Sequence, residues 1–164
     1  MDLNKYTKLE LFQAAIKSEK ESNMVYARLG AMVRNVFLKE KLVYLAKEEE
    51  KHAAVLMYEF VAHFPLQEMV IPEKSPIPLP EILIPDENVP LSEIIDSAIK
   101  AEIAARDFYL SMKDLFDAGD SIRNTLDFLA SMENAHHTLL SIERENIAQF
   151  EEYDAYWDMM NIGP

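Results

Sequence analysis

The sequence LAKEEEKH at residues 45–52 returns, in altered form, as LASMENAH at residues 129–136. Each copy ends in Glu-x-x-His, a Glu followed three positions later by a His. An earlier stretch is duplicated in the same order, since AIKSE at residues 15–19 returns as AIKAE at residues 98–102. The copies lie 84 and 83 residues apart, so the chain carries two versions of one segment.

The duplicated segments carry matching polar residues. The first copy holds Glu19, Tyr26, Glu49 and His52, and the second holds Glu102, Tyr109, Glu133 and His136. Positions three apart share one face of an α-helix, so each Glu-x-x-His can present both side chains to one ion. Four carboxylates and two imidazoles repeated on helices are the ligand inventory of a carboxylate-bridged dinuclear metal site in a four-helix bundle.

A single Glu-x-x-His motif would carry little information, because Glu is abundant in this chain and such pairs are common on solvated helix faces. The register of the two copies distinguishes this case, since every proposed ligand has a partner at the equivalent position of the other copy. The pattern therefore indicates duplication of a helical hairpin and not a chance pair of motifs.

The proposed ligands face the apolar interior. Ile16, Leu45 and Leu56 lie at helical spacing around the first set, and the second copy repeats the pattern. A buried carboxylate without a partner is costly, and two divalent cations would neutralise four carboxylates and two neutral imidazoles. Without metal, the like charges raise one another's pKa values. Mixed Glu and His ligation favours two iron ions, with manganese or zinc as the other candidates.

Composition limits the class of protein. At 164 residues, 49% of them hydrophobic, the chain has the size of one globular domain. A net charge of −13 argues against nucleic acid and anionic membranes as partners. No apolar run approaches the length of a membrane span and no signal-peptide pattern is present, so we expect a cytoplasmic protein. The absence of Cys excludes disulfides, iron–sulfur clusters and rubredoxin-type iron centres within these residues.

Four helices are expected, paired into two hairpins. A Thr7-x-x-Glu10 capping box starts the first helix, which should run to about residue 34. The break near Asn35 is short, so the second helix should run antiparallel to the first. The predicted hairpins cover residues 7–64 and 91–148, with the second helix over 36–63 and the fourth over 121–148.

The segment between the hairpins, residues 65–90, holds seven of the eight prolines and cannot be helical throughout. A linker between two independent hairpins would leave each ligand face uncovered, so we prefer a crossover along one bundle. The whole chain, residues 1–164, is then one domain. The apolar tail, residues 149–164, is expected to dock on its own bundle or on a neighbouring subunit.

In these features the chain resembles the ferritin-like superfamily, and most closely its rubrerythrin group. The resemblance rests on Glu-x(6)-Tyr followed by Glu-x-x-His, twice over, and on AIKSEKES at residues 15–22 and LAKEEEKH at residues 45–52. It covers residues 7–148 and implies an all-α, ferritin-like antiparallel four-helix bundle with a long proline-rich crossover between the second and third helices. Bacterioferritin shares the same symmetric ligand plan.

The resemblance also implies a role for each duplicated polar residue, carried over position by position. The roles are bridging carboxylates for Glu49 and Glu133, terminal carboxylates for Glu19 and Glu102, imidazole ligands for His52 and His136, and phenols that hydrogen-bond ligand carboxylates across the site for Tyr26 and Tyr109.

Two departures from the rubrerythrin pattern bear on activity. Rubrerythrins that reduce peroxide usually carry an extra Glu three residues after the third-helix ligand, and Ala105 stands there in this chain. The Cys-rich rubredoxin domain of many members has no counterpart in these residues. Any electrons should therefore come from a separate protein.

The resemblance implies a di-iron oxidoreductase that reduces peroxide or dioxygen with electrons from an external donor protein. We expect a homo-oligomer and favour a dimer. Two alternatives stay open. One is a ferroxidase or iron-storage subunit, which predicts a large hollow assembly, and the other is a metal-stabilised bundle that serves as a non-enzymatic interaction module.

Overall fold

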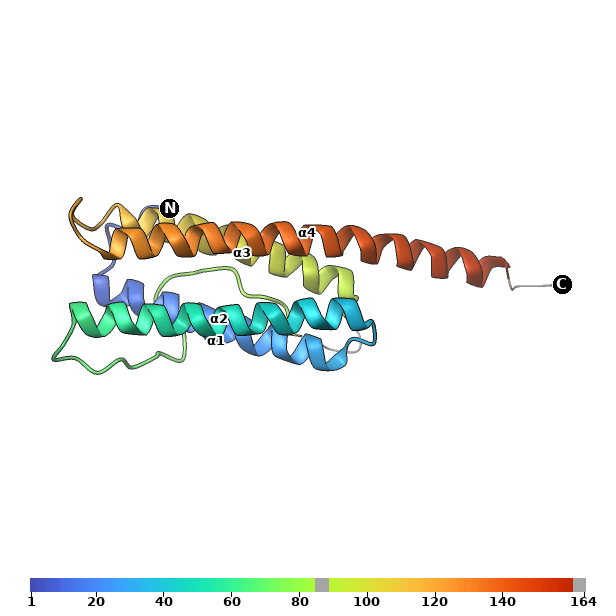
Figure 1. Ribbon diagram of the computed structural model, residues 1–164, viewed down its shortest axis with the longest axis horizontal. Helices are drawn as coiled ribbons and strands as arrows, with labels where there is room; N and C mark the ends of the chain where they lie inside the picture. The colour runs from blue at the N-terminus through green and yellow to red at the C-terminus, as the bar shows by residue number, and fades with distance from the viewer. Residues whose placement is uncertain (85–88, 161–164) are drawn as a thin grey trace.

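Four helices make up the regular structure of residues 1–84 and 89–160 (Figure 1). A computed structural model describes residues 1–84 and 89–160, with side chains as far as Gln149. The helices are α1 (Lys8–Met32), α2 (Val36–His63), α3 (Leu91–Lys113) and α4 (Ile122–Met160), and the described ranges contain no strand. The predicted all-α fold is confirmed.

The first hairpin is defined by the caps of its two helices. The Thr7 hydroxyl accepts a hydrogen bond from the Glu10 backbone at 3.2 Å, and the Glu10 carboxylate accepts one from the Thr7 backbone at 2.8 Å. At the start of α2, the Asn35 side chain accepts a hydrogen bond from the Leu38 backbone at 3.1 Å. These caps satisfy backbone donors that have no partner within the helix, and they fix a short connection between α1 and α2.

The two hairpins lie against each other, with α2 and α4 running in opposite directions (Figure 1). Helix α1 packs along α2, and α3 packs along α4. Figure 1 shows α2 ending at the left of the bundle and α3 beginning at the right. Residues 64–84, which follow α2, form neither helix nor strand. The predicted crossover includes residues 85–88, which lie outside the described residues.

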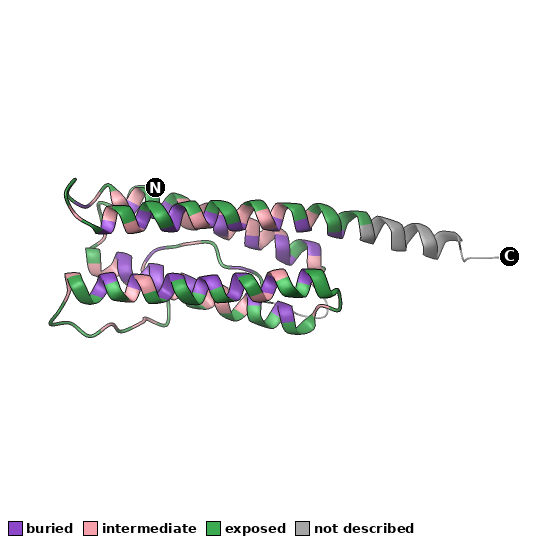
Figure 2. Ribbon diagram, in the orientation of Figure 1, coloured by how far each residue is buried: buried purple, intermediate pink, exposed green. Residues whose placement is uncertain are grey.

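The apolar core consists of two clusters, and both include part of the segment after α2. The first cluster contains Leu56, Phe108 and Ile77, and the second contains Leu45, Leu140 and Ile82. Figure 2 shows the buried residues on the inward faces of the helices. Each helix contributes to both clusters, and on each helix a polar stretch lies between the two contributions. The fold therefore places one polar layer between two apolar ones.

Helix α4 continues to Met160 and does not end near residue 148, so that predicted boundary is wrong. Residues 149–160 contain no Gly or Pro, the residues that most often terminate helices, so nothing in this stretch stops the helix. Docking of the tail depends on side chains from residue 150 onward, which lie outside the described side chains. None of the described helices is both long enough and apolar enough to cross a membrane.

The residues of the first apolar cluster that border the polar layer should contribute strongly to the stability of the fold. Leu56 is fully buried one turn after His52, and we expect Leu56→Ala to lower the free energy of unfolding of the metal-free protein by about 2–5 kcal/mol. Leu66 is 98% exposed, so Leu66→Ala should change it by no more than about 0.5 kcal/mol. Chemical denaturation measures both, and equal effects of the two substitutions would contradict this packing.

Candidate metal centre

The polar layer brings together the six residues that the sequence singles out as ligands. Helices α1 and α3 each contribute one Glu, and helices α2 and α4 each contribute one Glu and one His. These residues are Glu19, Glu49, His52, Glu102, Glu133 and His136, and each is 3% exposed or less. Such burial of four carboxylates in one layer is unusual, because an unpaired buried charge is costly.

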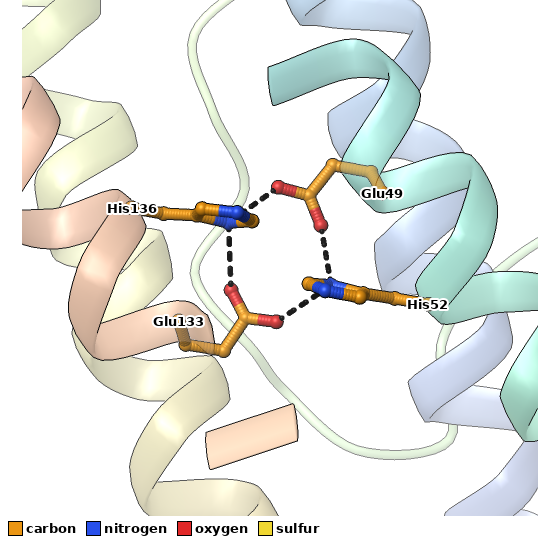
Figure 3. Close-up of side chains that lie close together, drawn as sticks. All are labelled: Glu49, His52, Glu133 and His136. Carbon is orange, nitrogen blue, oxygen red and sulfur yellow. Dashed lines mark hydrogen bonds and ion pairs between the residues drawn. The ribbon is translucent and has the colours of Figure 1, made fainter. Parts of the chain in front are cut away.

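The centre of the layer is a ring of two carboxylates and two imidazoles (Figure 3). The Nδ1 atom of His52 lies 3.0 Å from Glu49 Oε2 and 3.1 Å from Glu133 Oε1. The Nδ1 atom of His136 lies 3.0 Å from Glu49 Oε1 and 3.6 Å from Glu133 Oε2. One ligand atom from each residue can be chosen so that all four lie within 4.8 Å of one another. Each carboxylate therefore faces both imidazoles.

The other two carboxylates each belong to one half of the layer. Glu19 Oε2 lies 3.5 Å from His52 Nδ1, and Glu102 Oε2 lies 3.6 Å from His136 Nδ1. Each imidazole therefore has one Glu from the partner helix of its own hairpin, and the two halves share the central carboxylates. This division suits two ions with two shared and two separate carboxylates.

Two tyrosines connect the hairpins across the layer. The Tyr26 hydroxyl on α1 donates a hydrogen bond to Glu102 on α3, and the Tyr109 hydroxyl on α3 donates one to Glu19 on α1. Burial, followed by the charge of the bonded Glu, raises the pKa of both phenols well above the ordinary value. Both tyrosines therefore stay protonated as donors and orient the carboxylates that are not shared.

We call Glu19 and Glu102, the two carboxyl groups that are not shared, the outer carboxyl groups. In the metal-free protein they hold protons more tightly than exposed carboxyl groups do. Burial, and then the charges of Glu133 and Glu49, raise the pKa of Glu19 well above its ordinary value. Burial and contacts with the same two residues raise the pKa of Glu102 in the same way. Like charges in one desolvated layer cannot all ionise, so protonation of the outer pair relieves their repulsion.

The pKa values of the two imidazoles are raised, whereas those of the two central carboxylates are lowered. Burial by itself would lower the pKa of His52, but contacts with Glu133, Glu19 and Glu49 outweigh it and raise this pKa to about 12. The pKa of His136 rises for the same reason. Burial alone would raise the pKa values of Glu49 and Glu133, but their contacts with the imidazoles and the outer carboxyl groups keep both lower than usual. The layer thus reaches charge balance by protonation.

Several buried polar atoms in this layer have no hydrogen-bond partner. If two metal ions fit the layer, these atoms should include ones that the ions could bind. Among the described side chains, the buried polar atoms without a hydrogen-bond partner are Glu49 Oε1, Glu133 Oε1, His52 Nε2 and both ring nitrogens of His136. Glu49 Oε1 and His136 Nδ1 approach within 3.0 Å without hydrogen-bond alignment. Buried polar atoms without partners are rare. Metal coordination would satisfy the three that belong to the central ring, Glu49 Oε1, Glu133 Oε1 and His136 Nδ1.

Besides Glu48, which pairs with Lys51 within α2, α2 and α4 each carry one more buried carboxylate that the sequence did not single out. Glu59 on α2 is 8% exposed and Glu143 on α4 is 5% exposed. They also lie 84 residues apart, so the repeat register could have identified them. The residues that donate to them, Thr125 and Lys41, differ in type, so the sequence offers no matching partner for the two Glu.

Comparison with known proteins agrees with the geometry. The family model described as Rubrerythrin matches residues 10–143 of the chain. A solved structure described as a hypothetical protein from Pyrococcus furiosus is similar to this chain, with a TM-score of 0.80 and 29% sequence identity over 91% of this chain and 95% of that one. Among curated proteins, no sequence gives a significant match. The family match and the buried Glu and His cluster together fit a binuclear metal site.

Metal binding should release protons, because the pKa values of both imidazoles and of both outer carboxyl groups are raised in the metal-free protein. We expect at least about two protons to be released when two Mn²⁺ ions bind near neutral pH. Since all four pKa values are raised, protons compete with the metal, and the apparent affinity should increase as the pH rises from 5.5 to 8. Calorimetry in buffers of different ionisation enthalpy measures the proton count. Binding without proton release would contradict the assignment.

The tyrosine bonds should support metal affinity. Tyr26→Phe removes the donor to Glu102 without changing the shape of the side chain, and we expect it to weaken Mn²⁺ binding by about tenfold or more. Tyr58 is 75% exposed, so Tyr58→Phe on α2 is the matched control and should leave affinity unchanged. Titration of the metal-free proteins measures both constants. Equal affinities for the Tyr26 variant and the wild type would remove the positioning role of this phenol.

Proposed function

Because this chain belongs to the rubrerythrin family, we propose that it is a di-iron protein that reduces hydrogen peroxide or dioxygen with electrons from a separate donor protein. The observation that supports this function most strongly is the pseudo-symmetric buried layer of four Glu and two His, with inward-facing atoms that lack hydrogen bonds. A structural role alone does not require such a layer, since an apolar layer would stabilise the bundle at lower cost.

Iron is the metal we propose, because the layer mixes carboxylate oxygens with imidazole nitrogens and contains no thiolate. Two divalent ions would balance the four ionised carboxylates and take the place of the protons that the metal-free layer holds. A ferrous pair, when bound, supplies the two electrons that convert one peroxide molecule and two protons into two water molecules.

The protein's own residues would hold and shield this pair. Glu49 and Glu133 would bridge the two ions, and His52 and His136 would each bind one of them. The apolar clusters on both sides of the layer exclude water and so strengthen the electrostatic interactions inside it. Tyr26 and Tyr109 would fix the outer carboxylates through their hydrogen bonds.

The outer ligands should keep their places during turnover. Ala105 stands where many rubrerythrins have an additional Glu, and it packs against the first apolar cluster. No carboxylate at this position can replace Glu102, which is already held by Tyr26. We therefore propose that the same six ligands are kept throughout turnover. Electrons would come from another protein, because the 164 residues contain no Cys that could form a rubredoxin-type iron centre.

The same symmetric set of six ligands supports a second candidate function, a ferroxidase that oxidises ferrous ions for storage. The two functions differ in their use of added iron. A peroxide reductase should consume peroxide repeatedly with two irons per chain and an external reductant. A ferroxidase should instead oxidise many ferrous ions per chain and retain the product in a large assembly.

Stopped-flow mixing of anaerobically loaded ferrous protein with peroxide tests the proposed reaction. We expect oxidation of both irons by one peroxide per pair, at a rate at least about tenfold greater than that of free ferrous ion, and loss of this phase in Glu49→Gln. Glu50 is exposed next to Glu49, so Glu50→Gln is the matched control and should react like the wild type.

Two outcomes would count against the enzymatic proposal. Oxidation no faster than that of free ferrous ion would remove the enzymatic activity and leave a metal-stabilised interaction module. Rapid oxidation by dioxygen of far more than two ferrous ions per chain would favour the ferroxidase.

A further inference from the structure

The seam between α2 and α4 holds two buried carboxylates that are not part of the metal layer. The Thr125 hydroxyl on α4 donates a hydrogen bond to Glu59 Oε1 on α2 at 2.6 Å. The Lys41 ammonium on α2 donates to Glu143 Oε1 on α4. Each bond runs from one hairpin to the other. We call these two bonds the seam contacts.

The seam contacts are related by the same duplication as the ligands. Glu59 and Glu143 are 84 residues apart, as are Lys41 and Thr125, and this is also the separation of Glu49 and Glu133. Both copies of the duplicated segment therefore carry a buried Glu at one equivalent position and, at another, a residue that donates to the Glu of the other copy. Only the identity of the donor differs.

The seam contacts enclose the metal layer from both sides. Along α2 the order is Lys41, Glu49, His52 and Glu59, and the groups that face them on α4 follow in reverse order, Glu143, His136, Glu133 and Thr125. Each buried Glu lies ten residues beyond the shared carboxylate of its own helix, which is about 15 Å along the axis. The four interactions form one antiparallel ladder.

The position of α2 relative to α4 determines the distance between the shared carboxylates, because Glu49 lies on one helix and Glu133 on the other. The seam contacts join these two helices on either side of the layer without using any ligand. Both bonds have a buried carboxylate as the acceptor, and hydrogen bonds to an ionised group are stronger than neutral ones.

We propose that Glu59–Thr125 and Glu143–Lys41 are positioning contacts that hold α2 and α4 in the register at which Glu49 and Glu133 can both bridge two metal ions. The inference rests on the proposed function only in requiring that two ions bind. It assigns a role to four residues that are not among the six proposed ligands.

The two contacts should differ in their sensitivity to substitution. Loss of the Thr125 hydroxyl removes a neutral donor from Glu59. Loss of Lys41 removes the charged partner of Glu143, whose side chain is only 7% exposed, and leaves a buried charge unpaired. Lys41→Met should therefore have the larger effect on the position of α4.

Electron paramagnetic resonance with Mn²⁺ as the probe tests the proposal, because two neighbouring Mn²⁺ ions give an exchange-coupled spectrum and a single ion gives six lines. With two equivalents of Mn²⁺, the wild type should show the coupled spectrum. We expect Thr125→Val and Lys41→Met to weaken binding of the second ion by about tenfold or more and to show the six-line spectrum. The conservative variants Thr125→Ser and Lys41→Arg should restore the coupled spectrum.

Lys51→Met is the matched control, because Lys51 pairs with Glu48 within α2 and does not reach the other hairpin. It should keep the wild-type spectrum and affinity. Should Lys41→Met fail to fold, the double variant Lys41→Met/Glu143→Met removes both charges and should fold, yet still lose the coupled spectrum.

The outcomes separate this inference from the proposed function. Wild-type spectrum and affinity in both Thr125→Val and Lys41→Met would overturn the role of the seam contacts and leave the dinuclear site intact. Absence of a coupled spectrum in the wild type would overturn the dinuclear site and the role of the seam contacts together.

Discussion

The burial of four carboxylates between two apolar clusters is the constraint on which the rest of the structure depends. Carboxylates in such a layer repel one another and have lost their hydration, so they require protons or cations for balance. Each helix carries its proposed ligands between its contributions to the two clusters. The tyrosine bonds and the shared contacts of the imidazoles then orient every carboxylate in the layer.

Duplication explains why the layer is nearly symmetric. Two copies of one hairpin, placed against each other, provide each ligand type twice and make the pairing reciprocal: Tyr26 bonds to Glu102 and Tyr109 bonds to Glu19. The rubrerythrin family, to which the chain belongs, is associated with such binuclear sites. Two shared carboxylates, two separate carboxylates and two imidazoles would give similar surroundings to two bound ions.

Much of this arrangement could be predicted from the sequence because helical periodicity and the repeat register are local signals. The register brought the six buried residues into one hypothesis, and the capping box at Thr7 located the start of α1. The end of α4 was missed because an amphipathic pattern can weaken without any residue that stops a helix. The seam contacts were missed because Lys41 and Thr125 have different chemistry, and only the folded seam shows that both donate to a buried Glu.

The most direct test of the central idea is an anomalous diffraction measurement at the iron edge on crystals of protein loaded anaerobically with ferrous ion. We expect two iron peaks per chain within the buried layer, both within bonding distance of Glu49 and Glu133, with one next to His52 and the other next to His136. A single peak, or iron bound only outside this layer, would contradict it.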